Sequence, residues 1–363
     1  MSILFTITDL GMGGAQRQVC DLADTLFARG HQVTITYLLQ PAIVRPKSKE
    51  VELIWLGGTK SPIAMFKALM NLVKLIKKVR PDVVHSHMYH ANIVARLAKI
   101  FVRSPRLVCT AHNTNEGSAL RMFTYRMTNA LADVFTNVSQ DAVAAFETKH
   151  AAPMSEMLAI YNGIDTDTFK FNESGRTDIR NQASLQNKTV FIAIGRFHVE
   201  KDYPNLLAAF NQLVHNQPNI HLLIVGDGEL RETLEQTISD KQLTNSVTLL
   251  GVRNDIPELL SVADVFVLSS ASEGFGLVVA EAMACERRVV ATDSGGVAEV
   301  LGQEGFLVPP KNSEKLALAM EKALLLTDGE AKVMGIAARN RIVDKYSLNS
   351  VVDNWLKIYN AGQ

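Results

Sequence analysis

Short apolar runs alternate with helical patterns along most of the chain, and this alternation limits the fold more than any other feature of the sequence. Strands of parallel sheets are buried on both faces and read as continuous β-branched runs. The runs are ILFTIT, VTITYLL, VELIWL, DVVHSH, RLVCTAH, DVFTNVS and MLAIYNG in the first half, then TVFIAIG, HLLIVGDG, VTLLG, DVFVLSS, RRVVATDS and GFLVP. Because helical patterns separate them, we predict an α/β protein with two doubly wound parallel sheets.

The length also favours two domains, because single hydrophobic cores usually stop growing at roughly 250–300 residues. This chain has 363 residues. Polar and turn-forming residues cluster at 162–178. We therefore expect a first domain at residues 1–168 and a second domain at residues 169–345.

The composition indicates a soluble globular protein, with 47% apolar and 20% charged residues. No run reaches the roughly 18 apolar residues of a membrane-spanning helix, and the first residues lack the basic segment of a signal peptide. Cys20, Cys109 and Cys285 lie in apolar runs without zinc-ligand spacing. We expect buried thiols and a cytoplasmic location.

The charge is divided unevenly between the two halves. Residues 1–168 hold 18 Lys and Arg against 13 Asp and Glu; since the whole chain has 37 of each class, the remainder has 19 against 24. The basic first half suits an anionic lipid or an anionic acceptor, although chance explains a difference of this size equally well.

The stretch SSASEGFGLVVAEAMA places Glu273 and Glu281 around a glycine-rich turn between a strand and a helix. Gly274 and Gly276 allow a ligand to approach the backbone, and a helix N-terminus favours anionic groups. Two carboxylates would repel a bare phosphate but accept hydrogen bonds from sugar hydroxyls. The stretch therefore predicts a ligand that carries both phosphate and sugar.

A second glycine-rich turn follows the first strand, where dinucleotides bind in many such folds. The third glycine of that fingerprint would fall at Gln16, and the second strand ends in LQP without the acidic residue that holds a ribose. We therefore disfavour a nicotinamide enzyme. Gly13 and Gly14 either make a tight turn only or begin a helix whose amides point at phosphate.

With these features, the sequence resembles the retaining glycosyltransferases of the GT-B fold, which include bacterial mannosyl-, glucosyl- and N-acetylhexosaminyltransferases. The resemblance covers nearly the whole chain. Its most specific motif is Glu-x7-Glu, from Glu273 to Glu281. The accompanying motifs are GGAQR at 13–17, NGID at 162–165, GRFHVEKD at 195–202, GDG at 226–228 and SGGVAEV at 294–300.

The resemblance implies two Rossmann-like domains facing a cleft, with a C-terminal helix, 346–363, that packs back on the first domain. It implies catalytic roles for His112, Arg196, Lys201 and Glu273. Donor-binding residues would be Gly13, Gly14, Arg196, Lys201, Arg253, Glu273, Gly274, Phe275, Gly276, Leu277 and Glu281. Acceptor-side residues would be Gln16, Arg17, His112 and Asn113.

Individual roles follow from the chemistry of these side chains together with the resemblance. An Arg fork and a mobile Lys suit two adjoining phosphates, and Arg196 and Lys201 would hold the donor diphosphate; surface ion pairs with Glu200 or Asp202 are the alternative. Glu281 would bind ribose hydroxyls. His112 would hydrogen-bond a sugar hydroxyl or move a proton, unless it is structural.

We expect no metal cofactor. His85, His87 and His90 have mixed spacing at a strand end without nearby acidic residues. Asp165 and Asp167 form an Asp-x-Asp pattern, but it lies in the expected hinge. The resemblance implies that basic side chains and helix dipoles replace a metal.

An amphipathic helix is predicted at residues 62–80. One stripe contains Phe66, Leu69, Met70, Val73 and Ile76, and the other contains Lys67, Asn71, Lys74 and Lys78. We expect the apolar stripe to pack on the first sheet, while the lysines contact lipid head groups. Arg121, Tyr125 and Arg126 would extend that cationic surface.

The sequence therefore predicts a retaining hexosyltransferase. It would move a hexose or N-acetylhexosamine from a nucleoside-diphosphate sugar, with UDP favoured and GDP open, to a glycan acceptor. The acceptor would be lipid-linked, at the inner face of the cytoplasmic membrane, in O-antigen, lipopolysaccharide or capsule synthesis. A nucleotide-sugar epimerase and a binding protein without turnover are the alternatives, and we expect no nucleic-acid partner.

Overall fold

The computed structural model describes residues 1–102 and 105–361 and divides the chain into two compact units. The first unit contains Met1–Gly163 and Leu348–Gln363, and the second contains Ile164–Ser347. Residues 164–168, which we assigned to the first domain, therefore lie in the second unit. The C-terminal segment belongs to the first unit, and its residues 362–363 lie outside the described part.

The first unit is built around a seven-stranded parallel sheet in the order β3-β2-β1-β4-β5-β6-β7. Its strands are β1 (Ser2–Leu10), β2 (Gln32–Ala42), β3 (Glu52–Trp55), β4 (Val83–His87), β5 (Arg106–Thr110), β6 (Val134–Asn137) and β7 (Met157–Ala159). Its helices are α1 (Gly14–Ala28), α2 (Pro62–Val79), α3 (Tyr89–Ala98), η1 (Lys99–Phe101), α4 (Ala119–Thr128), η2 (Asn129–Leu131), α5 (Gln140–Thr148) and α14 (Leu348–Asn360).

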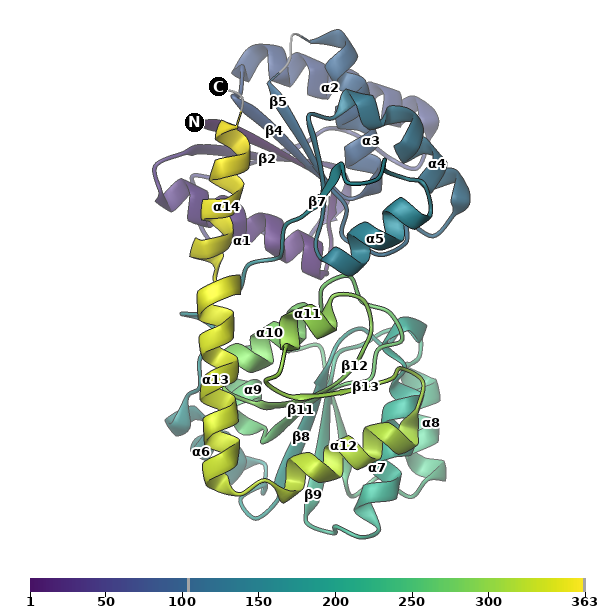
Figure 1. Cartoon of the computed structure of the whole chain (residues 1–363), viewed down its shortest axis with the longest axis vertical. Coiled ribbons are helices and arrows are strands. Elements are labelled where there is room, and N and C mark those ends of the chain that lie inside the picture. Colours follow the sequence, from purple (N-terminus) through teal and green to yellow (C-terminus); the bar gives the residue numbers. More distant parts are fainter. Residues whose placement is uncertain (103–104, 362–363) are drawn as a thin grey trace. The chain divides into compact units, whose positions relative to one another are not determined.

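Alternate residues of these strands serve two separate cores. Ile3, Phe5 and Ile7 of β1 point to the face covered by α1 and α14, whereas Leu4 points to the face covered by α2, α3, α4 and α5. Helix α14 lies beside α1 (Figure 1). Because both faces are buried, the strands read as the continuous apolar runs seen in the sequence.

The second unit repeats this plan with a six-stranded parallel sheet in the order β10-β9-β8-β11-β12-β13. Its strands are β8 (Thr189–Ile194), β9 (Ile220–Val225), β10 (Val247–Gly251), β11 (Val265–Leu268), β12 (Arg288–Thr292) and β13 (Phe306–Val308). Its helices are α6 (Glu173–Gln182), η3 (Val199–Lys201), α7 (Tyr203–Val214), α8 (Arg231–Asp240), α9 (Ile256–Val262), α10 (Leu277–Ala284), α11 (Val297–Leu301), α12 (Ser313–Leu325) and α13 (Asp328–Tyr346).

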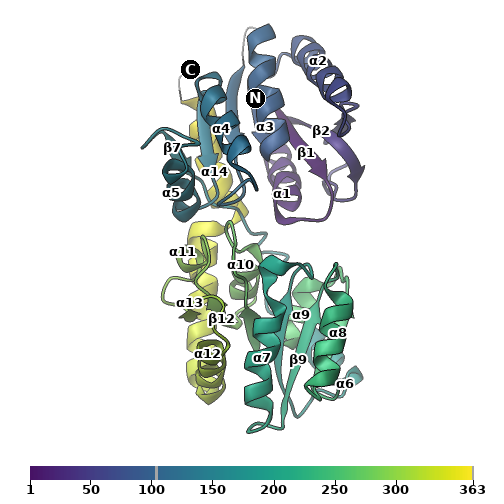
Figure 2. The same ribbon diagram turned by 90° about the vertical axis from the view of Figure 1, so that its right-hand side faces the viewer.

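Helices again cover the sheet of the second unit. Figure 2 shows α7 and α8 side by side next to β9, and these two helices share a core with α12. The predicted fold class, two doubly wound parallel α/β domains, is confirmed. Each predicted apolar run overlaps one of the strands.

The amphipathic prediction for residues 62–80 is partly wrong. Helix α2 buries Leu69, Val73 and Ile76 as expected, but Phe66 is 61% exposed. Tyr125 is fully buried and cannot extend a cationic surface. The three cysteines are free and buried, as predicted.

We predict that Trp355→Ala lowers the free energy of unfolding of the first unit by about 3–5 kcal/mol, the usual range for a buried tryptophan. Trp355 of α14 is 2% exposed and packs against the first sheet. Both tryptophans of the chain, Trp55 and Trp355, lie in this unit, so the fluorescence of Trp55 during urea denaturation reports its unfolding. Asn354→Ala on the exposed side of α14 is the control; equal stability of the two variants would contradict the prediction.

Candidate functional site

The strand order of the second unit creates a switch point between β8 and β11, because the chain winds away from these neighbours in opposite directions. Ligands bind such sheets at the carboxyl ends of the strands beside the switch point. Arg196 and Lys201 follow β8, and Glu273 follows β11. The structure thus brings two separate sequence motifs to one sheet edge.

Lys201 and Glu273 form an ion pair, with 2.5 Å between Nζ and Oε1. The two side chains are 23% and 13% exposed, so they are largely shielded from water. Lys201 therefore pairs with Glu273; an ion pair of Lys201 with Glu200 or Asp202 was the alternative expected from the sequence. A cation and a carboxylate are therefore held in place before any ligand arrives.

Hydroxyl groups at the strand ends support this ion pair. Ser270 Oγ donates to Glu273 Oε1 at 2.7 Å, and Ser269 Oγ donates to the Lys201 carbonyl at 2.8 Å. Thr292 Oγ1 in turn donates to the Ser270 carbonyl at 2.6 Å. None of these three residues was predicted as a site residue, although two polar residues directly after an apolar strand were a usable signal.

Two glycines let neighbouring loops touch this edge with their backbones. A Cβ on Gly226 would lie 1.9 Å from the Gly195 carbonyl oxygen, and a Cβ on Gly295 would lie 1.8 Å from the Glu273 carbonyl oxygen. Gly295 also has φ +58°, which favours glycine. The GDG and SGG motifs are thus in close backbone contact with the loops that carry Lys201 and Glu273.

The remaining donor-side residues have different surroundings. Arg196 is exposed. Arg253 donates to both carboxylate oxygens of Asp255, at 2.7 and 2.5 Å. Gly276 is the N-cap of α10, with φ +86° and no side-chain cap hydrogen bond. Leu277 is the first helical residue, and Glu281 lies partly exposed one turn further on. Phe275 is buried with its ring edge against Tyr346.

In the first unit, the glycine-rich turn after β1 is closed by a carboxylate. Asp9 Oδ1 accepts hydrogen bonds from the Gly11 amide and from Gln16 Nε2, both at 2.9 Å. This carboxylate, from the second-last residue of β1, bonds residues on both sides of Gly13 and Gly14, which does not favour a phosphate there. Arg17 forms an ion pair with Asp21 at 3.0 Å.

His112 and Asn113 follow β5 at the carboxyl edge of the first sheet. His112 Nε2 lies 3.0 Å from Nδ1 of His87, the last residue of β4. Among the described residues, no three His, Cys, Asp or Glu side chains form a group that could hold a metal ion. The rings of His85 and His87 pack against each other within the sheet core, tilted by 39° with 4.0 Å between ring centroids.

Glu116, in the same loop as His112, was missed by the sequence analysis. It is 8% exposed, and within the described chain its Oε1 is buried without a hydrogen-bond partner. Burial raises the pKa of this carboxyl to about 7, although Arg121 and a hydrogen bond from Tyr125 oppose the shift. A lone glutamate in a loop gives no sequence signal of burial.

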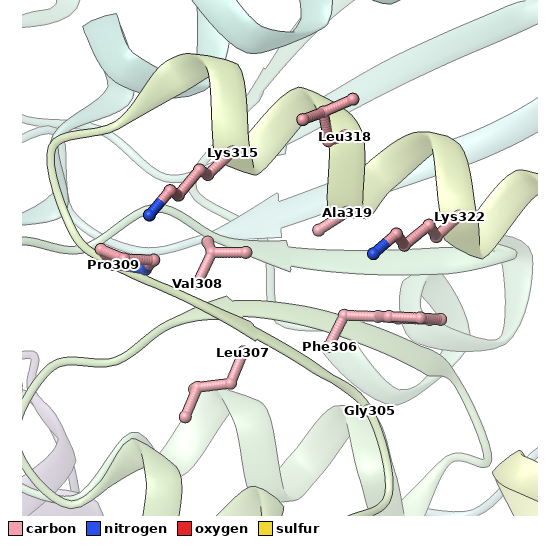
Figure 3. Close-up of a pocket in the computed structure, with 9 residues that line it drawn as sticks. All are labelled: Gly305, Phe306, Leu307, Val308, Pro309, Lys315, Leu318, Ala319 and Lys322. Carbon is pink, nitrogen blue, oxygen red and sulfur yellow. The ribbon is translucent and has the colours of Figure 1, made fainter.

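A groove of about 350 Å³ lies elsewhere in the second unit, between β13 and α12 (Figure 3). Lys315 and Lys322 reach from α12 toward the strand, and Leu318 lies between them on the helix. None of the predicted site residues lines this groove.

Comparison with known proteins gives a family match for each half of the chain. Residues 12–168 match the family model Glycosyltransferase Family 4, and residues 175–341 match Glycosyl transferases group 1. The chain is 28% identical over 317 residues to UDP-Gal:alpha-D-GlcNAc-diphosphoundecaprenol alpha-1,3-galactosyltransferase of Escherichia coli, covering 82% of this chain and 80% of that protein. It is also 28% identical to phosphatidyl-myo-inositol mannosyltransferase of Mycobacterium tuberculosis, over 96% of this chain and 93% of that protein.

The fold also matches solved structures. HepE of Anabaena, crystallised in complex with UDP and glucose, superposes with a TM-score of 0.84 at 24% identity and 99% coverage of both chains. WaaG, a glycosyltransferase involved in lipopolysaccharide biosynthesis, superposes with a TM-score of 0.74 at 19% identity, covering 99% of this chain and 100% of that one. The GT-B fold expected from the sequence is thereby confirmed.

We predict that Gly295→Ala destabilises the second unit, because the new methyl group meets the Glu273 carbonyl and the left-handed backbone is strained. The combined cost should be at least about 2 kcal/mol, seen as a lower melting temperature by calorimetry. Gly329→Ala is the matched control, since its Cβ would meet no atom within 4 Å. Equal melting temperatures for the two variants would refute the close approach.

Proposed function

On the premise that this chain is a glycosyltransferase, with a family match in each of its two domains, we propose that it transfers a hexose or N-acetylhexosamine from a nucleoside-diphosphate sugar to a glycan acceptor. The observation that carries the proposal is the shielded Lys201–Glu273 ion pair at the switch point of the second sheet, where the connection after β8 also contains Arg196. This arrangement offers positive charge to a diphosphate and a carboxylate to sugar hydroxyls.

We propose UDP as the donor nucleotide. The Escherichia coli relative is named for a UDP-galactose donor, and HepE was crystallised with UDP. Arg196 and Lys201 would bind the diphosphate, Glu273 the transferred sugar, and Glu281 the ribose. Glu281 is suited to that role because it projects from an otherwise apolar helix whose neighbouring residues are buried.

The proposed reaction breaks the bond between the anomeric carbon and the phosphate oxygen, which leaves with the electron pair. The acceptor hydroxyl oxygen forms the new bond from the same face, with retention, and its proton passes to the departing phosphate. Arg196, Lys201 and the N-terminus of α10 would stabilise the growing negative charge in place of a metal ion. A covalent glycosyl-enzyme in mass spectra of a trapped reaction would exclude this front-face route.

We propose a lipid-linked acceptor at the inner face of the cytoplasmic membrane, within the synthesis of a surface polysaccharide. The names of two relatives contain the lipids diphosphoundecaprenol and phosphatidyl-myo-inositol. None of the described helices has the length and apolarity to cross a membrane. Binding to a membrane surface would use α2 and α4, which contain no acidic residue.

The exposed side chains of α2 and α4 are suited to binding a membrane surface. Lys74, Lys77 and Lys78 of α2 point to solvent. Leu120, Phe123 and Met127 lie on one side of α4 and are 73%, 56% and 66% exposed. The two helices cover the same face of the sheet, on either side of α3. Basic and apolar side chains together favour an anionic bilayer surface.

We predict that UDP, compared with GDP, ADP and NAD in separate thermal melts, stabilises the second unit. At a hundredfold excess over its dissociation constant, UDP should add about 2.7 kcal/mol of stability. Glu281→Ala should abolish most of the shift, while Glu286→Ala beyond the same helix should retain it. A shift with NAD alone, or with no nucleotide, would refute the proposed donor.

We predict that replacing Lys74, Lys77 and Lys78 together by Glu weakens binding to anionic vesicles by about 100-fold or more, at about 1 kcal/mol per lysine. Vesicle co-sedimentation at fixed salt measures this loss. The control variant replaces the exposed Lys241, Lys332 and Lys345 of the second unit by Glu, which makes the same change in net charge. Similar losses in both variants, or in neither, would refute binding through α2.

A further inference from the structure

Three histidine side chains form a continuous cluster in the first unit. His85 and His87 lie on the same face of β4, with 4.0 Å between ring centroids. His87 Nδ1 lies 3.0 Å from Nε2 of His112, which follows the neighbouring strand β5. His85 and His87 are buried, whereas His112 as a whole residue is partly exposed at the carboxyl edge of the sheet.

The surroundings hold this cluster in one arrangement. His85 uses both ring nitrogens, with Nδ1 2.7 Å from the Tyr359 hydroxyl and Nε2 2.7 Å from Thr110 Oγ1. Trp355 of α14 packs against His85 at 4.5 Å between centroids. Met88, directly after His87, has φ 70° and ψ 160°, a conformation that persists only where its surroundings impose it.

In the hydrogen bond between His87 and His112, one imidazole must donate and the other must accept. Burial lowers the pKa of His112 to about 4 and that of His87 well below its usual value, and His85 lowers the pKa of His87 further. Both rings are therefore neutral at neutral pH. Each neutral ring carries one N–H, so the position of the proton on one ring decides its position on the other.

The buried Nε2 of His87 distinguishes the two possibilities. This atom has no hydrogen-bond partner within the described residues. If His112 donated from Nε2, the proton of His87 would be on its own Nε2, as a buried N–H without an acceptor. If His87 donates from Nδ1, its Nε2 is only a lone pair, and unpaired buried acceptors are less rare than unpaired buried N–H groups.

We propose that His87 is a positioning residue, which donates its Nδ1–H to His112 Nε2 and thereby holds His112 as the Nδ1–H tautomer. His112 then presents an N–H donor, and its Nε2 is not available as a base. The ligand group that it recognises is an oxygen acceptor, such as a sugar hydroxyl. The assignment of that oxygen to a sugar rests on the proposed function, whereas the tautomer does not.

The direct test is NMR of the intact chain labelled with ¹⁵N-histidine, because long-range ¹H–¹⁵N correlations distinguish the two tautomers. His112→Gln and His87→Gln assign the signals. We expect His112 protonated at Nδ1 and His87 protonated at Nδ1. A His112 ring protonated at Nε2 would overturn the inference, and this outcome does not depend on any activity.

Two variants test the consequence for transfer. His87→Phe keeps a flat ring but removes the donor, and should lower kcat/KM about tenfold while the thermal shift by UDP stays unchanged. His87→Gln retains an N–H donor and should recover most of the loss. Tyr359→Phe is the control, because it removes a hydrogen bond from the same cluster at His85 without touching His112.

The outcomes separate the two proposals. Unchanged transfer in His87→Phe, or equal losses in the Phe and Gln variants, would overturn the role of His87 as a donor. Wild-type transfer in His112→Ala would instead overturn the role of His112 in the proposed function, and the NMR result would still decide the tautomer.

Discussion

The winding reversal within each parallel sheet is the constraint on which the described sites depend. All strands of a sheet point the same way, so their carboxyl ends form one edge, and helices leaving neighbouring strands in opposite directions keep the middle of that edge open. The Lys201–Glu273 pair lies beside the reversal at β8 and β11. The His87–His112 contact lies beside the reversal at β1 and β4. Both contacts thus lie where parallel sheets of this type commonly bind ligands.

Short-range contacts give these edges a definite geometry. The Lys201–Glu273 pair has lost much of its hydration, so it contributes less to the net stability of the fold than to the fixed placement of a positive and a negative charge. Ser269 and Ser270, directly after β11, donate to the Lys201 carbonyl and the Glu273 carboxylate. Thr292 of β12 donates to the Ser270 carbonyl, and Gly295 lets a third loop touch the Glu273 backbone. In the first unit, α14 has a comparable role, since Trp355 and Tyr359 support the buried histidines.

The sequence predicted some features well and others poorly, for identifiable reasons. Strands were recognised because burial on both faces demands apolar runs, whatever their neighbours. The exposed Phe66 and the buried Tyr125 were mispredicted because the rotation of a helix on a sheet depends on its neighbours, here α3. The sequence disfavoured a metal at His85 and His87 but did not reveal their surroundings, because spacing alone does not show that their nitrogens face Tyr359, Thr110 and His112.

The sequence by itself determined the α/β class, the two sheets and the glycine turns, because strand burial and backbone freedom are properties of residue types in short windows. Glu273 and Lys201 were also recognisable as motif residues. Only the tertiary structure decided that these two form a pair, that Ser270 supports it, and that His87 meets His112. Those contacts join residues from different strands, and the distance between strand ends is set by sheet order and packing, which no local pattern encodes.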